Sequence, residues 1–432
     1  MTLRSTAFGL LFAVSLIAAA GNMALQSVLP AIGRAFELSD TLVAGAFAIS
    51  ALMWTLTSPY WARLSDRLGR KRVILIGLSG FVASMGAFGL AATSGLEGWL
   101  AALVAFTLMA VARTIYGLFG SAAPIASQAY VADRTSRRAR TRAMSMLASA
   151  QGLGTVLGPA LAPFFVLPFV GLAGPMYAFA ALGAVVLVLV WRLLPSGGVE
   201  RRPTTPDTHR GLWKDPRLRD FLLYGLLVTG AQAVNIGVLG FHVIDELAVQ
   251  GVGLEAAQPF VGIAMFAGAA ATLMVQWGVI PLLRMQPRAL MRWGAALALA
   301  GNGVSVFAEG FYGVVAGYAI ISMGVGFARP GFTAGASLAA RPEEQGAVAG
   351  LIMALAGLSF LAPPVAGVAL YEWAEPAPFW LNVVLLAVSL ALCFISPALK
   401  DGEGRAAPTQ PASQPGPEGA AVAPPSSGRI SV

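Results

Sequence analysis

The chain has 432 residues, of which 57% are hydrophobic and only 11% are charged. A soluble domain is about half apolar and about a quarter charged, so a soluble core could not hide this much apolar surface. The formal net charge of +8 does not indicate a nucleic-acid-binding protein, because the basic residues punctuate apolar runs instead of clustering on one soluble surface. The composition predicts an integral membrane protein with no nucleic-acid partner.

Apolar runs long enough to cross a bilayer, about 20 residues each, recur along the chain. The first run resembles a cleavable signal peptide up to Ala20, but it continues to Pro30 and is long enough for a full span. The sequence predicts an all-α polytopic membrane protein with twelve spans, near residues 7–30, 43–62, 73–93, 99–130, 143–168, 172–194, 220–246, 258–283, 289–308, 311–336, 346–371 and 377–397.

One long break, rich in proline, glycine and charge, separates the sixth span from the seventh. The stretches 143–163 and 347–367 align without gaps, which favours two pseudo-symmetric six-helix bundles, although chance similarity between alanine-rich helices is the alternative. The composition of the last residues cannot bury enough apolar surface to fold alone. We therefore expect four parts: a first bundle over 1–194, a cytoplasmic linker over 195–218, a second bundle over 219–398, and a disordered cytoplasmic tail over 399–432.

The basic residues predict the orientation, because cytoplasmic loops retain Lys and Arg. With the N-terminus inside, nearly all of them fall in cytoplasmic segments. The exceptions are Arg34 in the first outer loop, and Arg113 and Arg329 inside spans. This bias predicts that both termini lie in the cytoplasm of a bacterial-type inner membrane.

The loop between the second and third spans reads WARLSDRLGRKR from Trp61 to Arg72. Gly69 permits a tight turn, and the charged side chains beside it can bridge helix ends, although a basic loop that only sets topology is the alternative. The stretch resembles motif A of the major facilitator superfamily, with Ala62 in place of the motif's first glycine. The resemblance implies a conformational lock for the outward-facing state, formed by Asp66, Arg67, Gly69, Arg70 and Asp133.

An arginine inside the fourth span, Arg113, is costly in a bilayer and should face the bundle interior, where it finds a partner. With Gly117 it resembles motif B of the same superfamily, which is associated with proton transfer, whereas Phe119 departs from that motif. A purely structural tether is the alternative.

The fifth span contains Gly154, Gly158 and Pro159, which resemble motif C, the antiporter signature of the superfamily. Ala162 and Pro163 stand where the motif ends in glycines, and a plain packing motif of small residues would also explain the pattern. The three motifs together resemble the twelve-helix drug:proton antiporters most closely. This resemblance implies protons as the coupling ion.

Polar residues within apolar spans should line the solute pathway, since lipid-facing positions would leave them unsatisfied. The amides of the first and seventh spans are expected to face each other, with hydrogen bonds that only pack helices as the alternative. The predicted pathway residues are Asn22, Gln26, Arg113, Tyr116, Tyr224, Gln232, Asn235 and Arg329.

Acidic residues are absent from the middle of the spans, so the sequence itself does not reveal a proton site. The best candidates are His242, Asp245 and Glu246 at the outer end of the seventh span, where solvated cap residues are the alternative interpretation. A pathway with Arg113 and without buried acids should favour neutral or anionic solutes over cations.

We therefore expect a secondary transporter, acting as a monomer, that exports an amphipathic small molecule by alternating access, coupled to protons. Uptake of an anionic metabolite or siderophore on the same fold is the alternative. A membrane enzyme or a non-transporting receptor is a third hypothesis, but no nucleotide loop, metal-ligand cluster or nucleophile triad appears in the sequence, and we expect no cofactor.

Overall fold

The computed structural model describes residues 5–135, 137–196, 211–341 and 344–400. Much of the predicted linker (197–210) and nearly all of the predicted tail (401–432) lie outside these ranges.

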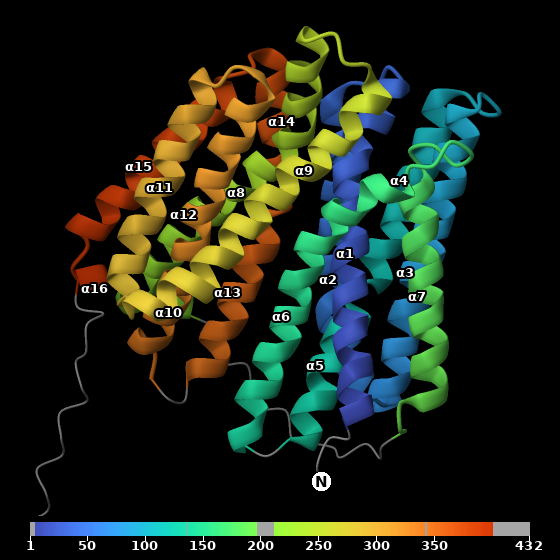
Figure 1. The fold of residues 1–432 in the computed structure, drawn as a ribbon. Coiled ribbons are helices and arrows are strands. Elements are labelled where there is room, and N and C mark those ends of the chain that lie inside the picture. Colours follow the sequence, from blue (N-terminus) through green and yellow to red (C-terminus); the bar gives the residue numbers. More distant parts are fainter. Residues whose placement is uncertain (1–4, 136, 197–210, 342–343, 401–432) are drawn as a thin grey trace, which may run out of the picture.

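Helices make up almost the whole described chain, arranged as two bundles side by side (Figure 1). The first bundle contains α1 (Ser5–Ala35), α2 (Asp40–Leu68), α3 (Arg70–Leu96), α4 (Ala102–Phe119), α5 (Ala122–Arg134), α6 (Arg137–Leu161), the 3₁₀ turn η1 (Ala162–Phe165) and α7 (Gly174–Leu193). The second contains η2 (Leu212–Lys214), α8 (Pro216–Val249), α9 (Leu254–Leu273), the π-helical segment η3 (Met274–Val279), α10 (Ile280–Leu283), α11 (Pro287–Phe307), α12 (Gly310–Ala339), α13 (Gln345–Ser359), α14 (Pro363–Trp373), α15 (Ala377–Ile395) and α16 (Pro397–Lys400).

Ten helices within the described residues are long and apolar enough to cross a membrane, counting α4 with α5, α9 with α10, and α13 with α14 as single crossings. The helices α6 and α11 occupy the two remaining predicted spans. The predicted all-α, twelve-span membrane fold is confirmed.

Two predicted spans are interrupted. The fourth turns at Gly120 and Ser121, between α4 and α5, and the eleventh breaks between Ser359 and Pro363. The aligned Pro159 in the first half lies inside the continuous helix α6. One proline removes a single backbone donor and bends a helix, whereas the pair Pro363 and Pro364 removes two in succession, so the chain starts a new helix there.

The same helix-to-helix contact occurs in both halves. A Cβ placed on Gly77 of α3 would lie 2.5 Å from the backbone nitrogen of Ala123, and one placed on Gly294 of α11 would lie 2.6 Å from that of Ala328. Glycine is required at both positions because the backbones approach closely. The third and ninth spans therefore pack in equivalent ways, which supports the two-fold pattern.

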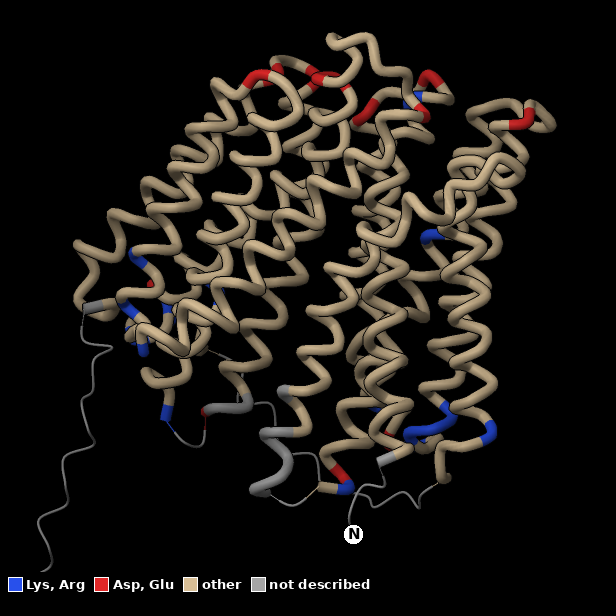
Figure 2. Tube along the Cα trace, in the orientation of Figure 1, with Lys and Arg blue, Asp and Glu red and all other residues tan. Residues whose placement is uncertain are grey.

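Charged residues divide between the two ends of the molecule (Figure 2). We call the end at which α2 meets α3 the basic end, and the opposite end, at which α1 meets α2, the acidic end. By the helix ends on which they lie, the described acidic residues at the acidic end are Glu37, Asp40, Glu97, Asp245, Glu246, Glu255, Glu309, Glu372 and Glu375. Among the described residues, Arg34 is the one Lys or Arg located there.

The two halves meet toward the acidic end. Gly240 of α8 packs against Pro30 of α1, since a Cβ on this glycine would lie 2.5 Å from the proline ring. Gly262 of α9 lies against the carbonyl oxygen of Pro159 in α6 in the same way. At the basic end, α6 and α13 lie apart (Figure 1). The two bundles are therefore closed against each other at the acidic end.

Candidate functional site

Arg113 is buried in the first half with part of its guanidinium unpaired. The residue is only 3% exposed, and its Nη2 donates a hydrogen bond to Oδ1 of Asn22 at 3.1 Å. Its Nε and Nη1 are buried and find no hydrogen-bond partner among the described residues. The guanidinium carbon lies 4.8 Å from the centre of the Phe47 ring and 4.7 Å from that of Tyr116. Two aromatic faces thus surround a cation to which no described carboxylate is paired.

Close packing of α2 on α4 places these aromatic rings beside Arg113. A Cβ on Gly117 would lie 2.5 Å from the carbonyl oxygen of Ser50, so only glycine lets α2 approach α4 here. Trp61 fixes the same contact farther along α2 by donating to the carbonyl oxygen of Leu118 at 2.6 Å. Phe47 lies on α2 one turn from Ser50, and the approach brings its ring beside Arg113. Motif-B-like residues therefore shape the setting of Arg113.

The predicted pathway amides bond within their own halves. Asn22 accepts from Arg113, whereas Asn235 of α8 accepts from Nδ2 of Asn382 at 3.1 Å. Asn382 of α15 also donates to Oδ1 of Asn302 in α11 at 3.1 Å. These three asparagines join α8, α11 and α15 inside the second bundle. The structure does not bring Asn22 and Asn235 together.

The other predicted pathway residues are scattered. Tyr224 is fully buried and donates to the carbonyl oxygen of Met291 at 2.6 Å, as part of the second-half core. Gln26 and Gln232 are half-buried, and Oε1 of Gln26 has no partner among the described residues. Arg329 of α12 is exposed.

The motif-A-like residues form a cluster within the first half. Arg70 pairs with Asp66 at 2.5 Å and with Asp133 of α5 at 2.9 Å. Gly69 joins α2 to α3 with φ of 91°, a conformation that side chains with a Cβ resist. Arg67 is exposed and takes no part in the cluster. In the described residues the cluster ties α2, α3 and α5 together without reaching the second half.

The motif-C-like glycines bring α6 against α1. A Cβ on Gly154 would lie 2.5 Å from the carbonyl oxygen of Leu16, and one on Gly158 would clash with the carbonyl oxygen of Ala20. Pro159, the next residue, contacts the second half through Gly262. One short segment of α6 therefore packs on both halves.

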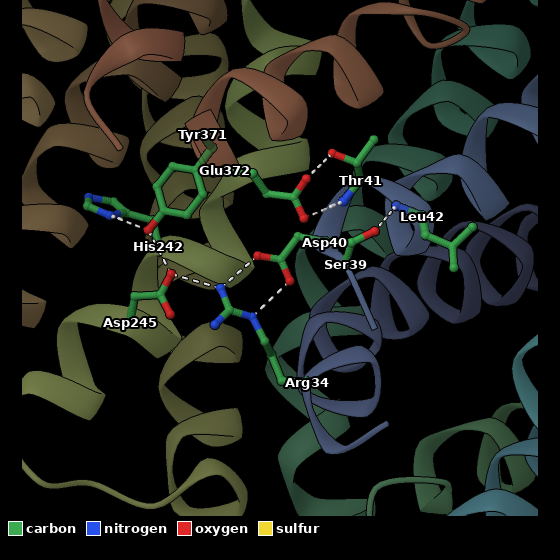
Figure 3. Close-up of polar contacts among 9 residues, drawn as sticks. All are labelled: Arg34, Ser39, Asp40, Thr41, Leu42, His242, Asp245, Tyr371 and Glu372. Atoms are coloured by element: carbon green, nitrogen blue, oxygen red, sulfur yellow. Dashed lines mark hydrogen bonds and ion pairs between the residues drawn. The ribbon is translucent and has the colours of Figure 1, made fainter. Parts of the chain in front are cut away.

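At the acidic end, a cluster of polar side chains crosses from one half to the other (Figure 3). Arg34, in the last turn of α1 and not in a loop as expected, donates to both oxygens of Asp40, at 2.8 Å and 2.6 Å. Its Nη2 also donates to Oδ2 of Asp245 in α8 at 3.0 Å. Thr41 and Glu372 of α14 make a second cross-half contact, in which the Thr41 N–H donates at 3.2 Å. We call Arg34, Asp40, Asp245, Tyr371 and His242 the acidic-end cluster.

The predicted proton-site residues divide between two roles. Asp245 belongs to the acidic-end cluster, where the Tyr371 hydroxyl donates to it at 2.9 Å. His242 lies behind, with Nδ1 at 3.4 Å from the same hydroxyl oxygen. Glu246 instead accepts from the Gly310 N–H at 2.6 Å and holds the start of α12. A cavity of about 520 Å³ lies over the cluster, lined by Arg34, Leu38, Ser39, Asp40, Asp245, Tyr371, Glu372, Trp373, Ala374 and Glu375.

Sequence reasoning missed Arg34, Asp40 and Tyr371. One signal was available for Arg34, because a lone basic residue among acidic ones contradicts the charge bias of its side of the membrane. Nothing in the sequence indicated that Asp40 and Asp245, which are far apart along the chain, share one guanidinium. No group of three or more His, Cys, Asp or Glu side chains in the described residues could hold a metal ion.

Comparison with known proteins agrees with the fold. The chain is 28% identical over 200 residues to multidrug resistance protein 2 of Bacillus subtilis, covering 46% of each protein. It is 31% identical over 155 residues to the class B tetracycline resistance protein of Escherichia coli, covering 35% of each. The matched part spans less than half the length of these curated relatives.

A solved bacterial homologue of the human lysosomal transporter Spinster, in an inward-facing and unoccupied conformation, superposes with a TM-score of 0.71 at 15% identity, covering 94% of this chain and all of that one. The human organic anion transporter MFSD10 superposes with a TM-score of 0.61 at 18% identity, covering 91% of this chain and all of the other. These likenesses establish the fold.

The family model for the major facilitator superfamily matches residues 11–362, which is most of the chain. With two six-helix bundles meeting at one end, this protein is a membrane transporter and not an enzyme, and it belongs to the major facilitator superfamily.

Proposed function

We propose that this transporter exports a neutral or anionic amphipathic small molecule in exchange for protons. In this proposal a single copy alternates access between the two membrane faces. Relatives named for multidrug and tetracycline resistance support export. The antiporter-like segment at Gly154, Gly158 and Pro159 supports exchange.

The proposed preference for neutral or anionic solutes rests on the guanidinium of Arg113, whose Nε and Nη1 have no partner among the described residues. A charged side chain deep in a bilayer costs about 3 kcal/mol on insertion scales, and each aromatic face returns about 0.5–2 kcal/mol. Phe47 and Tyr116 therefore offset the cost in large part, yet Nε and Nη1 remain without acceptors. An acidic group on the solute would satisfy those donors, whereas a cationic group would be repelled.

The orientation that we propose places the basic end in the cytoplasm of a bacterial-type plasma membrane, with both termini inside. Positively charged loops are retained on the cytoplasmic side, and the basic loop around Arg70 is one such segment in the first half. Closure at the acidic end then makes this structure inward-facing, ready to take a solute from the cytoplasm.

Import of an anionic metabolite or siderophore is the second candidate, because Arg113 would serve an imported anion equally well. The direction of transport separates the two candidates.

The test uses energised inverted vesicles that contain the protein and a dye reporting the internal pH. Four probes cover the charge classes: tetracycline, a lipophilic sulfonate, a neutral steroid and a quaternary ammonium dye. We expect the sulfonate, or the two probes without net charge, tetracycline and the steroid, to dissipate the pH gradient. We expect Arg113→Gln to abolish the response to the sulfonate, and Arg113→Lys to keep part of it.

The matched control is Arg63→Gln, which removes an exposed arginine from the basic end. Its response to every probe should equal that of the unchanged protein. Export is excluded if folded protein dissipates the gradient with none of the probes but accumulates the sulfonate in right-side-out vesicles. The charge preference is excluded if Arg113→Gln loses only the response to the cationic dye.

A further inference from the structure

A chain of hydrogen-bonding groups leads from the cavity at the acidic end to a buried imidazole (Figure 3). Asp245 lines that cavity and accepts from the Tyr371 hydroxyl at 2.9 Å. The same hydroxyl oxygen lies 3.4 Å from Nδ1 of His242. His242 is only 5% exposed, its ring lies 5.2 Å from that of Phe379, and its Nε2 has no partner among the described residues. Three titratable groups in a row therefore connect solvent with the interior.

When the acidic end is closed, the acidic-end cluster contains one cationic group and two carboxylates. Asp40 comes from the first half and Asp245 from the second, and both pair with the single guanidinium of Arg34. An imidazolium at His242 would give two cations for two carboxylates. Burial opposes that charge, whereas the Asp245 carboxylate, which accepts from the same Tyr371 hydroxyl, favours it.

The remaining charged groups around the cluster have other partners or face solvent. Glu246 on α8 accepts from the Gly310 N–H, and Glu372 on α14 accepts from Thr41. Glu375, after α14, is exposed. Phe379, on α15, contributes an uncharged ring beside His242.

We propose that the coupling proton binds at His242, reaches it from the acidic-end cavity through Asp245 and Tyr371, and thereby favours closure of the acidic end. This inference rests on the proton coupling of the proposed function. A proton from water adds to the Asp245 carboxylate, and the carboxyl then donates to the Tyr371 oxygen while the hydroxyl passes its own proton to Nδ1. Asp245 is again a carboxylate able to pair with Arg34, and His242 is an imidazolium.

Proton binding at His242 would couple the proton gradient to the change between the two conformations. A proton arriving from the acidic side stabilises the closed acidic end, which is the inward-facing state. An unprotonated His242 lacks this stabilisation, which favours the outward-facing state.

Transport measurements test the site first. Reconstituted vesicles are assayed for transport driven by a pH gradient and for counterflow, in which labelled solute exchanges with unlabelled solute without a gradient. With the compound identified by the four-probe panel, His242→Gln and Tyr371→Phe should lose gradient-driven transport and retain counterflow. The matched controls are His209→Gln, which changes the other histidine of the chain, and Tyr312→Phe, which changes an exposed tyrosine.

Retention of gradient-driven transport by both His242→Gln and Tyr371→Phe would overturn the inference. If the unchanged protein shows no gradient-driven transport with any probe, the proposed proton coupling itself fails. A second measurement, of the distance between two spin labels, needs neither solute nor turnover. It decides the inference if the protein shows no gradient-driven transport, and also if the variants lose counterflow.

Spin labels at Leu42 of α2 and Trp373 of α14 would report closure, because both side chains are exposed beside the Thr41–Glu372 contact. Cys393, the one cysteine, is replaced by alanine beforehand. As the pH falls from about 8 to about 6, across the range in which histidine titrates, the short-distance population should grow. His242→Gln should abolish this dependence. An unchanged pH dependence in His242→Gln, or none in the parent protein, would refute the proton site.

Discussion

At the scale of single residues, the polar groups of the bundle differ in how completely they are satisfied. Arg113 retains unpaired donors, and this feature suits a residue that waits for a solute. The two protons of Asn382 Nδ2 are instead shared among three acceptors, namely Oδ1 of Asn235, Oδ1 of Asn302 and the carbonyl oxygen of Ala231, the last at 3.2 Å. The nitrogen of this amide therefore joins α8, α11 and α15, while its Oδ1 has no partner among the described residues.

Replacing Asn382 with leucine, which has nearly the same volume, should destabilise the second bundle. The change leaves the acceptors of Asn235 and Asn302 without their shared donor, and a buried group left unsatisfied costs about 1–3 kcal/mol. Thermal unfolding in detergent would measure the loss. Ser94→Ala, at a hydroxyl that bonds only within its own helix, is the control. A melting temperature equal to that of the control would contradict this role.

Individual residues also show what the sequence can and cannot reveal about the site. Arg113 was predictable, because a charge inside an apolar run is expensive and demands a reason. Tyr224 was a predicted pathway residue, yet it lies in the core, because a polar residue within one span does not reveal which neighbour covers it. The acidic-end cluster depends on α1, α2, α8 and α14 meeting in space, and no local pattern encodes that meeting.

At the scale of helices, small residues decide which pairs approach closely. Gly158 lies against the backbone of α1, which cannot yield as the end of a flexible side chain could. By contrast, a Cβ on Gly152, on the same helix, would meet nothing within 4 Å.

Gly158→Ala should therefore separate α6 from α1 and cause a marked loss of folded protein and of transport. Gly152→Ala is the matched control, and it should be neutral or slightly stabilising, since alanine favours helix over glycine by about 1 kcal/mol. Yield of monodisperse protein and thermal unfolding would distinguish the two. Equal behaviour of both variants would mean that the α1–α6 contact is looser than described.

The beginning of α8 carries a pH-sensitive contact outside the spans. Arg217 donates to Asp215, its N-cap neighbour, at 2.5 Å and to Glu344 before α13 at 3.2 Å. The hydrogen bond from Arg217 holds the pKa of Asp215 below its usual 3.8. The backbone N–H of Arg341, followed by Arg217, lowers the pKa of Glu344 below its usual 4.5.

Because these pKa values are lowered in the folded protein, their contribution to stability is complete at neutral pH and is lost as the pH falls through the carboxyl range. Thermal unfolding should show this loss below about pH 4.5. Arg217→Gln should reduce it, while Arg219→Gln, whose partner is the adjacent Asp220, should leave it unchanged. Identical pH profiles for the two variants would exclude Arg217 as the cause.

Helix positions were largely predictable from apolar length, because a bilayer demands about 20 apolar residues per crossing. The breaks were not. Pro363 and Pro364 interrupt the eleventh span, whereas the aligned Pro159 leaves α6 continuous. The two cases differ because the second half has two consecutive prolines and the first half has one. The alignment matched Pro159 with Pro363 and gave no weight to the additional Pro364.

At the scale of the whole molecule, two charged clusters lie at opposite ends and differ in what they join. The cluster around Arg70 joins helices of one half, so it does not hold the halves together in this conformation. The pairing of Arg34 with Asp245 does cross between halves. The closed acidic end therefore depends in part on one guanidinium.

Arg34→Gln should shift the population toward opening at the acidic end. Partly exposed ion pairs are worth about 1 kcal/mol at most, which corresponds to a roughly fivefold change in the ratio of open to closed molecules. Spin-label distances between Leu42 and Trp373 would measure the shift, with Arg63→Gln at the basic end as control. An unchanged distance distribution would show that Pro30–Gly240 and the other apolar contacts close this end without help.

The cavity over the acidic-end cluster has a pharmacological consequence. Its walls come from both halves, so its shape exists only while they are closed there. A ligand that fits those walls binds the closed state alone and shifts the population toward it. With the acidic end outside, such a compound would arrest the transporter from the external medium, without entering the cell and without competing for the solute.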